Sequence, residues 1–340
     1  MKLGYIAGYW AAGPPPGIED SLRAAEDLGF DSFWTAEAYG SDALTPLAWW
    51  GAKTSRIKLG TAIAQVSART PTAMAMAAMT LDHLSGGRFI LGLGASGPQV
   101  VEGWYGQPYT RPLERTREYV EVVRKVLSRD EPVAYAGRQY HVPYAGGTGL
   151  GKPLSIVHPL RPDLPVYLGA EGPRNVAMTA EIADGWLATF FSPKSDAFYR
   201  AALAEGFARP GARRTAETFE VAAAVPVIPM SDVEAAADTQ RPTLALYIGG
   251  MGARTMNFHY EVFARMGYEA ECATIQRLYL EGHKREAIAA VPTKMVEDVA
   301  LIGPIEKVRD DLQRWRETCV TTLLVGGPPP LLETIAKVVT

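Results

Sequence analysis

Cysteine is scarce in this sequence of 340 residues, and metal-binding patterns are missing. The two cysteines, Cys272 and Cys319, lie far apart and have no second pair of ligands nearby. A disulfide framework and a zinc site are therefore not expected, and two buried free thiols are predicted. The five histidines show no metal-ligand spacing either, so no bound metal is predicted.

Strong net charge and long apolar runs are also absent. The net charge is −3 and 21% of the residues are charged, which argues against a surface for polyanions such as nucleic acid. No window approaches the run of about 18 apolar residues that spans a membrane. The sequence enters an apolar run at residue 3 without a charged leader or a cleavage site. A cytoplasmic protein with no membrane partner is expected.

Short apolar runs instead alternate with segments whose apolar residues recur at helical spacing, which predicts parallel strands joined by right-handed helical crossovers. Strands are predicted at 2–9, 31–35, 57–64, 89–94, 166–169, 185–189, 219–228 and 321–325. Helices are predicted at 17–28, 41–54, 71–83, 113–127, 174–182, 195–207, 305–318 and 331–338. Two further segments, about 130–165 and 231–291, interrupt this order after helix four and strand seven. The pattern predicts one (β/α)8 TIM barrel domain over 1–340 with two insertions.

A glycine-rich segment follows the fourth strand. Gly92, Gly94 and Gly97 match the GxGxxG pattern of dinucleotide-binding folds, but that pattern requires a helix to open at the last glycine. Here prolines and glycines keep the predicted helix away until about Leu113. Two other interpretations stay open: the glycines form only a tight turn, or they form a loop at a barrel mouth that faces a phosphate or a cofactor.

In such barrels the ligand site lies at the carboxyl ends of the strands, so residues that follow different strands converge there. The small residues after strands four and five can present backbone N–H groups to a phosphate, and a helix begins just after the second group. This favours a large, flat, phosphorylated cofactor. The candidates that follow the strands are Gly8, Tyr9, Glu37, Tyr39, Gln65, Gly94, Ala95, Ser96, Gly97, Ala170, Glu171, Gly172 and Pro173.

The second insertion contains candidates for a substrate pocket. Its segment 251–260 includes Met251, Arg254 and His259, which could line such a pocket or could belong to a surface or a dimer contact. His83 lies in the third predicted helix and is assigned a structural role.

Several segments together resemble the luciferase-like monooxygenase superfamily, and within it the coenzyme F420-dependent oxidoreductases. The matching segments, which cover most of the chain in the family's order, are 28–34 with Glu37, 57–63, 69–71, 81–89, 91–94 and 183–186. The resemblance implies a (β/α)8 barrel with an insertion. It also implies a non-prolyl cis peptide near Thr61, Ala62 and Ile63 that supports the flavin ring, phosphate contacts at 94–97 and 170–173, and an acidic residue at Glu37.

The resemblance implies an F420-dependent oxidoreductase that transfers a hydride between the deazaflavin and a small organic substrate such as a carbonyl, an alcohol or an activated alkene. Two alternatives remain: an FMN-dependent two-component monooxygenase and a non-catalytic flavin-binding protein. Relatives that act on sugar phosphates have an acid followed by His after strand two, whereas this chain has Glu37, Ala38 and Tyr39. That chemistry is disfavoured, and Glu37 or Tyr39 is the candidate for proton handling.

The resemblance also implies a homodimer that forms through the second and third helices. The run 73–79 alternates alanine and methionine, which are small or adaptable side chains suited to close helix packing. The same run could instead face the barrel as ordinary core.

Overall fold

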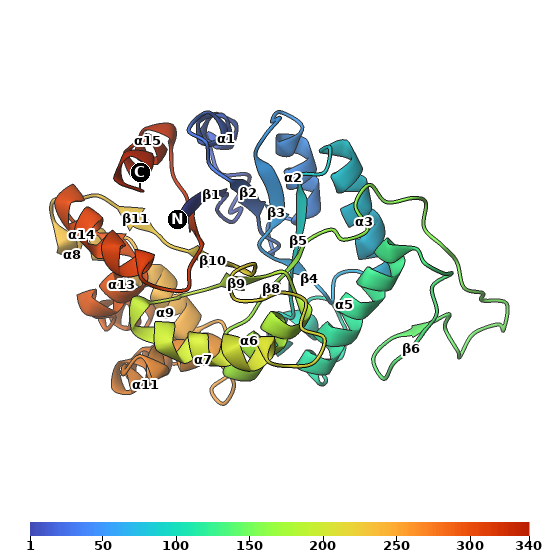
Figure 1. Ribbon diagram of the computed structural model, residues 1–340. Helices are drawn as coiled ribbons and strands as arrows, with labels where there is room; N and C mark the ends of the chain where they lie inside the picture. Colours follow the sequence, from blue (N-terminus) through green and yellow to red (C-terminus); the bar gives the residue numbers. More distant parts are fainter. Residues whose placement is uncertain (340) are drawn as a thin grey trace.

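A closed parallel barrel forms the centre of the computed structural model, which describes residues 1–339 (Figure 1). The order β3-β2-β1-β13-β10-β9-β8-β5-β4 closes because β5 pairs with both β3 and β4, which share one barrel position. The (β/α)8 prediction is therefore confirmed. The barrel strands are β1 (Lys2–Ile6), β2 (Ser32–Thr35), β3 (Lys58–Thr61), β4 (Ala64–Gln65), β5 (Phe89–Gly94), β8 (Val166–Gly169), β9 (Gly185–Ala188), β10 (Glu220–Ala224) and β13 (Thr322–Val325).

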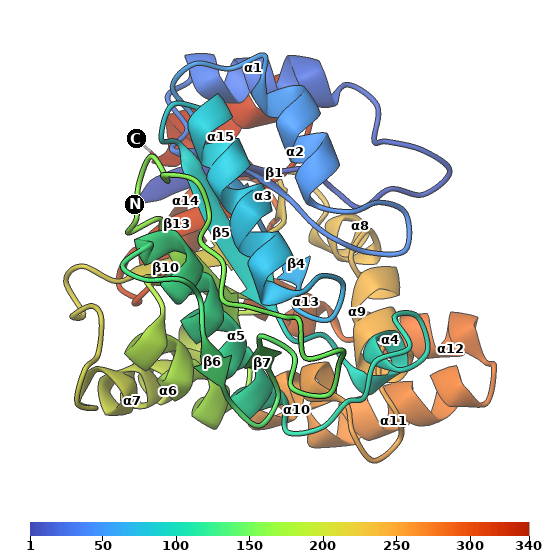
Figure 2. The ribbon, with the colours of Figure 1, turned by 90° about the vertical axis from the view of Figure 1, so that its right-hand side faces the viewer.

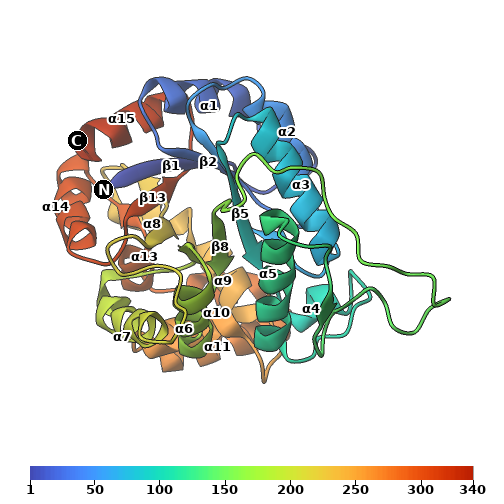
Figure 3. The same cartoon turned by 45° about the vertical axis from the view of Figure 1, so that its right-hand side comes forward.

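Helices surround the ring of strands (Figure 3). Each turns its apolar stripe toward the barrel, as α5 does with Tyr119, Val122 and Val126. These outer helices are α1 (Ile18–Asp27), α2 (Leu44–Gly51), α3 (Pro71–Leu84), α5 (Pro112–Ser128), α6 (Pro173–Ile182), α7 (Asp196–Phe207), α14 (Ile305–Arg316) and α15 (Pro329–Val339). The predicted helix at 41–54 is shorter than expected, because Asp42 accepts hydrogen bonds from the N–H groups of Leu44 and Thr45 and thereby sets its start.

The predicted strand at 219–228 is divided. Its first part is β10, whereas its second part, β11 (Val227–Ile228), leaves the barrel and pairs with β12 (Leu301–Ile302). Between these two short strands lies the second insertion, which Figure 2 shows gathered at one end of the molecule and which continues beyond residue 291. Its helices are α8 (Val233–Asp238), α9 (Arg241–Gly249), α10 (Phe258–Arg265), α11 (Glu269–Leu280), α12 (Lys284–Ala289) and α13 (Thr293–Val299). They pack around their own apolar cluster, which includes Ile248, Phe263 and Ile275.

The first insertion is a long loop that extends away from the barrel (Figure 1). It contains one small antiparallel pair, β6 (Tyr135–Ala136) with β7 (His141–Val142). Apolar side chains such as Tyr144 and Leu150 are exposed along it. His83 contacts this loop through Nε2, which lies 3.0 Å from the carbonyl oxygen of His158.

The third helix, α3, presents both kinds of surface. Met74, Ala75 and Ala78 are buried, whereas Met76 is exposed. Much of the alanine and methionine run is therefore core, and the homodimer stays a prediction.

Of the two cysteines, Cys272 is buried and Cys319 is half-buried. Within residues 1–339 no helix is long and apolar enough to cross a membrane.

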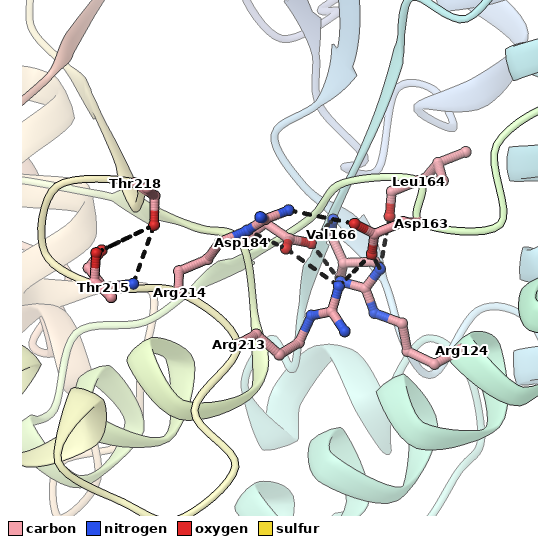
Figure 4. A network of polar contacts seen from close by, with 9 residues as sticks. All are labelled: Arg124, Asp163, Leu164, Val166, Asp184, Arg213, Arg214, Thr215 and Thr218. Carbon is pink, nitrogen blue, oxygen red and sulfur yellow. Dashed lines mark hydrogen bonds and ion pairs between the residues drawn. The ribbon is translucent and has the colours of Figure 1, made fainter.

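Asp184 anchors a polar network where the loops lead into β8 and β9 (Figure 4). Its Oδ2 accepts from the N–H of Val166 over 2.9 Å and pairs with Arg124. Its Oδ1 accepts from Nε of Arg214 over 2.8 Å. Burial alone would raise the pKa of Asp184, but the charges of Arg124 and Arg213 and the Val166 N–H lower it overall. Because its side chain is 3% exposed, this carboxylate is part of the barrel's support.

Candidate functional site

A cavity of about 1010 Å³ opens at the carboxyl ends of the barrel strands. This is the end at which (β/α)8 barrels build their sites. Its lining comes from loops after almost every strand and from α9 and α10 of the second insertion. The cavity is therefore the candidate active site.

The floor of the cavity is apolar and consists of small or medium-sized side chains. It includes Ile6, Leu187, Ala222 and Leu324 from four strands. Ala62 and Ile63, which lie between β3 and β4 and are joined by a cis peptide, complete it. The family resemblance predicted a cis peptide near Thr61, Ala62 and Ile63, and the observed bond lies among these residues. An apolar floor of small and medium-sized side chains suits the face of an apolar ring system.

Ile63 is fixed in position by two glycines. A Cβ at Gly94 would lie 2.8 Å from the Ile63 side chain, and one at Gly169 would lie 3.2 Å from it. The first distance is too short for any larger residue unless the neighbour moves. The glycines at the ends of β5 and β8 therefore give Ile63 its space beneath the cavity.

Glu37 stands at the wall of the cavity in an ion pair. Its Oε1 lies 2.8 Å from Nη1 of Arg69, and its Oε2 accepts from the N–H of Gln65 over 2.7 Å. Its own N–H donates to the carbonyl of Ile63 over 3.0 Å. The side chain of Glu37 is 4% exposed, so this is a well-buried charge with a partner. Glu37 thus braces the segment that carries the cis peptide.

Gln65 has an unsatisfied acceptor at the cavity wall. The residue is 5% exposed, and its Oε1 is buried without a hydrogen-bond partner among the described residues. A buried polar atom without a partner destabilises the protein unless a ligand or a water supplies one. A ligand with a hydrogen-bond donor at this position would satisfy it.

Two glycine-containing loops form another part of the wall. Gly94 to Gly97 lead directly into α4 (Pro98–Val101), a single turn that the sequence analysis did not predict. Gly172 caps α6, a ten-residue helix whose start lies at the cavity. The first N–H groups of such a helix have no intrahelical acceptor and carry a partial positive charge. Arg174, also in the lining, is exposed and forms no ion pair with any side chain of residues 1–339.

His259 and Glu171 contact each other at the cavity wall. His259 belongs to the second insertion, and Glu171 lies in the loop after β8. Nδ1 of His259 lies 2.7 Å from Oε1 of Glu171, but the ring N–H is not aligned for a hydrogen bond. Oε2 of Glu171 is also buried without a partner. The His259 ring packs edge to face on Tyr247, with centroids 4.7 Å apart, and the Tyr247 hydroxyl lies 3.5 Å from that of Tyr9. An imidazole and a carboxylate in contact are side chains suited to acid–base catalysis, and here they lie in the lining of the cavity.

Most of the predicted site residues line this cavity. They are Tyr9, Glu37, Tyr39, Ala62, Ile63, Gln65, Gly94, Ala95, Ser96, Gly97, Ala170, Glu171, Gly172, Pro173, Met251 and His259. Gly8 and Arg254 are exposed and lie outside the lining. Thr61 is fully buried beneath it and is hydrogen-bonded to Gly92. The roles assigned to all these residues stay predictions.

The sequence analysis did not assign Arg174, Tyr247 or Trp104, which lie in the cavity lining or contact a residue of it. Arg174 follows a predicted loop but was counted as helix, and Tyr247 lies in an insertion whose path the periodicity does not define. Trp104 stacks edge to face on Tyr39, with centroids 5.8 Å apart. An aromatic residue in a loop rich in glycine and proline was the available signal for Trp104.

Comparison with known proteins agrees with this geometry. The family model described as luciferase-like monooxygenase matches residues 6–322. The chain belongs to this family. A relative from Mycobacterium tuberculosis, provisionally named a coenzyme F420-dependent oxidoreductase, is 55% identical over 328 residues, which cover 96% of this chain and 94% of the relative. The resemblance found in the sequence is therefore confirmed.

Other proteins to which the chain is similar are more distant. The 5,10-methylenetetrahydromethanopterin reductase of Archaeoglobus fulgidus is 28% identical over 313 residues, with 92% of this chain and 89% of the relative covered. The solved coenzyme F420-dependent tetrahydromethanopterin reductase of Methanopyrus kandleri has a TM-score of 0.77 at 25% identity, and the match covers 99% of this chain and 97% of that one. An F420-dependent secondary alcohol dehydrogenase, solved with an F420-acetone adduct, has a TM-score of 0.78 at 17% identity and coverages of 99% and 97%, and shows a shared fold.

Proposed function

We propose that this protein is a coenzyme F420-dependent oxidoreductase that transfers a hydride between the deazaflavin and an organic carbonyl, alcohol or activated alkene. The single observation that carries the proposal is the cavity at the barrel mouth, which combines an apolar floor with two glycine-containing loops and the start of a helix. The activity named for the M. tuberculosis relative, 55% identical, supports the same cofactor.

The residues of the cavity fit a ring system with a polar edge. Ala62 and Ile63 would support one face of the ring from below, because they lie in the apolar floor. The unpartnered Oε1 of Gln65 would accept a hydrogen bond from an N–H of the ring edge. When bound, the deazaflavin supplies the hydride chemistry, and the protein supplies position and a dry surrounding.

The phosphorylated tail would lie at the two glycine-containing loops. Gly94 to Gly97 and the start of α6 at Gly172 present backbone to the cavity with little side-chain bulk. The positive end of the α6 dipole favours an anion, and the free guanidinium of Arg174 adds a full charge there.

Reduction of a carbonyl needs one hydride on carbon and one proton on oxygen. The sequence assigned proton handling to Glu37 or Tyr39, and that assignment stays a prediction. The ion pair of Glu37 with Arg69 supports a positioning role for this carboxylate. His259, paired with Glu171 and in the lining, is the group that we propose to hold the proton.

The test has to distinguish the proposed hydride transfer from two alternative functions. An FMN-dependent monooxygenase would use the same barrel and would consume dioxygen, and a non-catalytic flavin-binding protein would bind without turnover. The experiment is anaerobic mixing of the protein, loaded with reduced deazaflavin, with a panel of ketones, aldehydes and activated alkenes. The proposal predicts recovery of the oxidised cofactor's absorbance with one equivalent of reduced product. Tight cofactor binding without oxidation by any compound contradicts it and supports the non-catalytic alternative.

A further inference from the structure

Four aromatic side chains from four separate segments lie at the cavity or next to it, in two contacting pairs: Tyr39 with Trp104, and Tyr9 with Tyr247. We call them the aromatic rim: Tyr9, Tyr39, Trp104 and Tyr247. Tyr9 follows β1, Tyr39 follows β2, Trp104 follows α4, and Tyr247 lies on α9 of the second insertion. Three of them line the cavity, and Trp104 joins them through its contact with Tyr39.

Three of the four side chains of the aromatic rim are largely exposed, and the fourth, Tyr247, is half-buried. Tyr9 is 57% exposed, and Tyr39 and Trp104 are each 62% exposed. Single exposed apolar residues are ordinary, but several large ones around one concave opening mark a binding surface. Met256 and Phe258 in the same lining are also partly exposed, at 47% and 42%. A ligand that covered these side chains would bury apolar area and gain free energy.

The charges around the cavity indicate what kind of ligand this is. Within the described lining, the carboxylate of Glu37 pairs with Arg69, and that of Glu171 lies against His259. Arg174, the unpaired cation of the lining, stands at the start of α6, where the cofactor tail is proposed to lie. None of the four rim side chains carries a positive charge that could pair with an anionic substrate. The free-energy cost of removing such a substrate from water would therefore not be offset there.

We propose that the aromatic rim is the substrate subsite and that it takes an uncharged carbonyl compound, or the corresponding alcohol, with an aromatic or polycyclic body. This inference rests on the proposed function, because it assigns the carbonyl to the hydride-accepting end. The body of the substrate packs against the rings of Tyr39 and Trp104 and against those of Tyr9 and Tyr247. Its oxygen points inward toward His259, which contacts Tyr247. Edge-to-face packing of rings makes such a subsite selective for aromatic shape as well as for apolar area.

The test compares two ketones that share the reacting group and differ in the body, 2-acetylnaphthalene and acetone. Binding of each to the purified apoprotein and to the protein loaded with oxidised deazaflavin is measured by calorimetry. The variants are Tyr39→Ala and Trp104→Ala, with Trp104→Phe as the variant that keeps an aromatic ring. Tyr144→Ala, which removes an aromatic residue that is 77% exposed in the first insertion, is the matched control.

The proposal predicts that the wild-type protein binds 2-acetylnaphthalene at least about a hundredfold more tightly than acetone. Each alanine variant should bind 2-acetylnaphthalene about tenfold more weakly than wild type. Trp104→Phe and Tyr144→Ala should bind it with an affinity within about twofold of wild type. The affinity for deazaflavin should change little in all variants.

Equal affinity for the two ketones overturns the proposal. So does a loss of deazaflavin affinity in the alanine variants as large as the loss for the ketone, because the rim would then cover the cofactor. Failure of the proposed function has a different signature. In that case the apoprotein binds no deazaflavin, whatever the rim variants do to the ketone.

Discussion

The Oγ1 of Thr61 donates to the carbonyl of Gly92 over 2.7 Å and accepts from the N–H of the same residue over 2.9 Å. This reciprocal pair joins β3 to β5 directly beneath the cavity. It satisfies both backbone groups of Gly92 at the point where the third barrel position is interrupted between β3 and β4. The pair therefore helps to close the barrel where the candidate site needs an irregular backbone.

Gly92→Ala tests this contact. An added Cβ would lie 1.7 Å from the carbonyl oxygen of Thr61, which is a backbone atom that cannot rotate away. We expect the free energy of unfolding to fall by more than about 3 kcal/mol, measured by chemical denaturation. Gly13→Ala is the control, because a Cβ there has no neighbour within 4 Å. Equal stability of the two variants would contradict the close approach of β3 and β5.

Asp184→Asn tests the support network of the barrel. The side chain is 3% exposed and faces Arg124, Arg213 and Arg214. Its replacement leaves the exposed Asp163 as the remaining carboxylate for these guanidiniums, of which Arg124 is the most buried at 16% exposure. We expect a loss of about 3 to 5 kcal/mol in the free energy of unfolding at pH 7.

The effect of this substitution should depend on pH in one direction. Because the pKa of Asp184 is lowered in the folded protein, its carboxylate stabilises the fold above the pKa of the unfolded chain, which is about 3.9 for aspartate. The contribution is lost as the pH falls through the folded pKa. The stability difference between wild type and Asp184→Asn should therefore shrink below about pH 4. A difference that stays constant down to pH 3 would show that the carboxylate does not hold this network.

Glu37→Gln separates positioning from proton transfer. The amide cannot form the ion pair with Arg69, so the brace on Ile63 should loosen and the deazaflavin should bind about tenfold more weakly. If Glu37 only positions this segment, the pH profile of kcat keeps its shape. Loss of one limb of that profile would instead assign the proton to Glu37, as the sequence analysis predicted.

His259→Gln tests the proposed proton carrier. We expect kcat for ketone reduction to fall by about 10² to 10⁴, with the affinity for deazaflavin within about twofold of wild type. Glu171→Gln should lower kcat less, because it removes the partner and keeps the imidazole. A His259→Gln protein with wild-type kcat at every pH would eliminate this residue and leave Glu37 and Tyr39 as the remaining candidates.

The barrel could be predicted because its signal is local. Short apolar runs such as 89–93 form strands and alternate with amphipathic helices, and this order alone fixes parallel pairing. The same rule brings residues after different strands together, so Glu37, Gln65, Gly94 and Glu171 could be assigned to one site before the structure was known. The cis peptide at Ala62 and Ile63 was instead predicted from the family resemblance.

The rest of the site depends on paths that periodicity does not define. Trp104 reaches Tyr39 only because the chain makes a single helical turn after Gly97 and then bends back. Arg254 was grouped with His259 by proximity in sequence, but it is exposed and outside the lining, whereas His259 lies in the first turn of α10 and lines the cavity. The ion pair of Glu37 with Arg69 joins two loops, and no local pattern in either loop indicates it.

The measurement that tests the central claim most directly is equilibrium binding of deazaflavin F420 and of FMN, side by side, to the purified apoprotein by fluorescence. The account predicts micromolar or tighter binding of the deazaflavin and binding of FMN that is at least about tenfold weaker. Gly13→Ala should show the same preference. The reverse preference would contradict the account and direct the search to oxygen consumption, and no binding of either cofactor would leave the glycine loops as turns without a ligand.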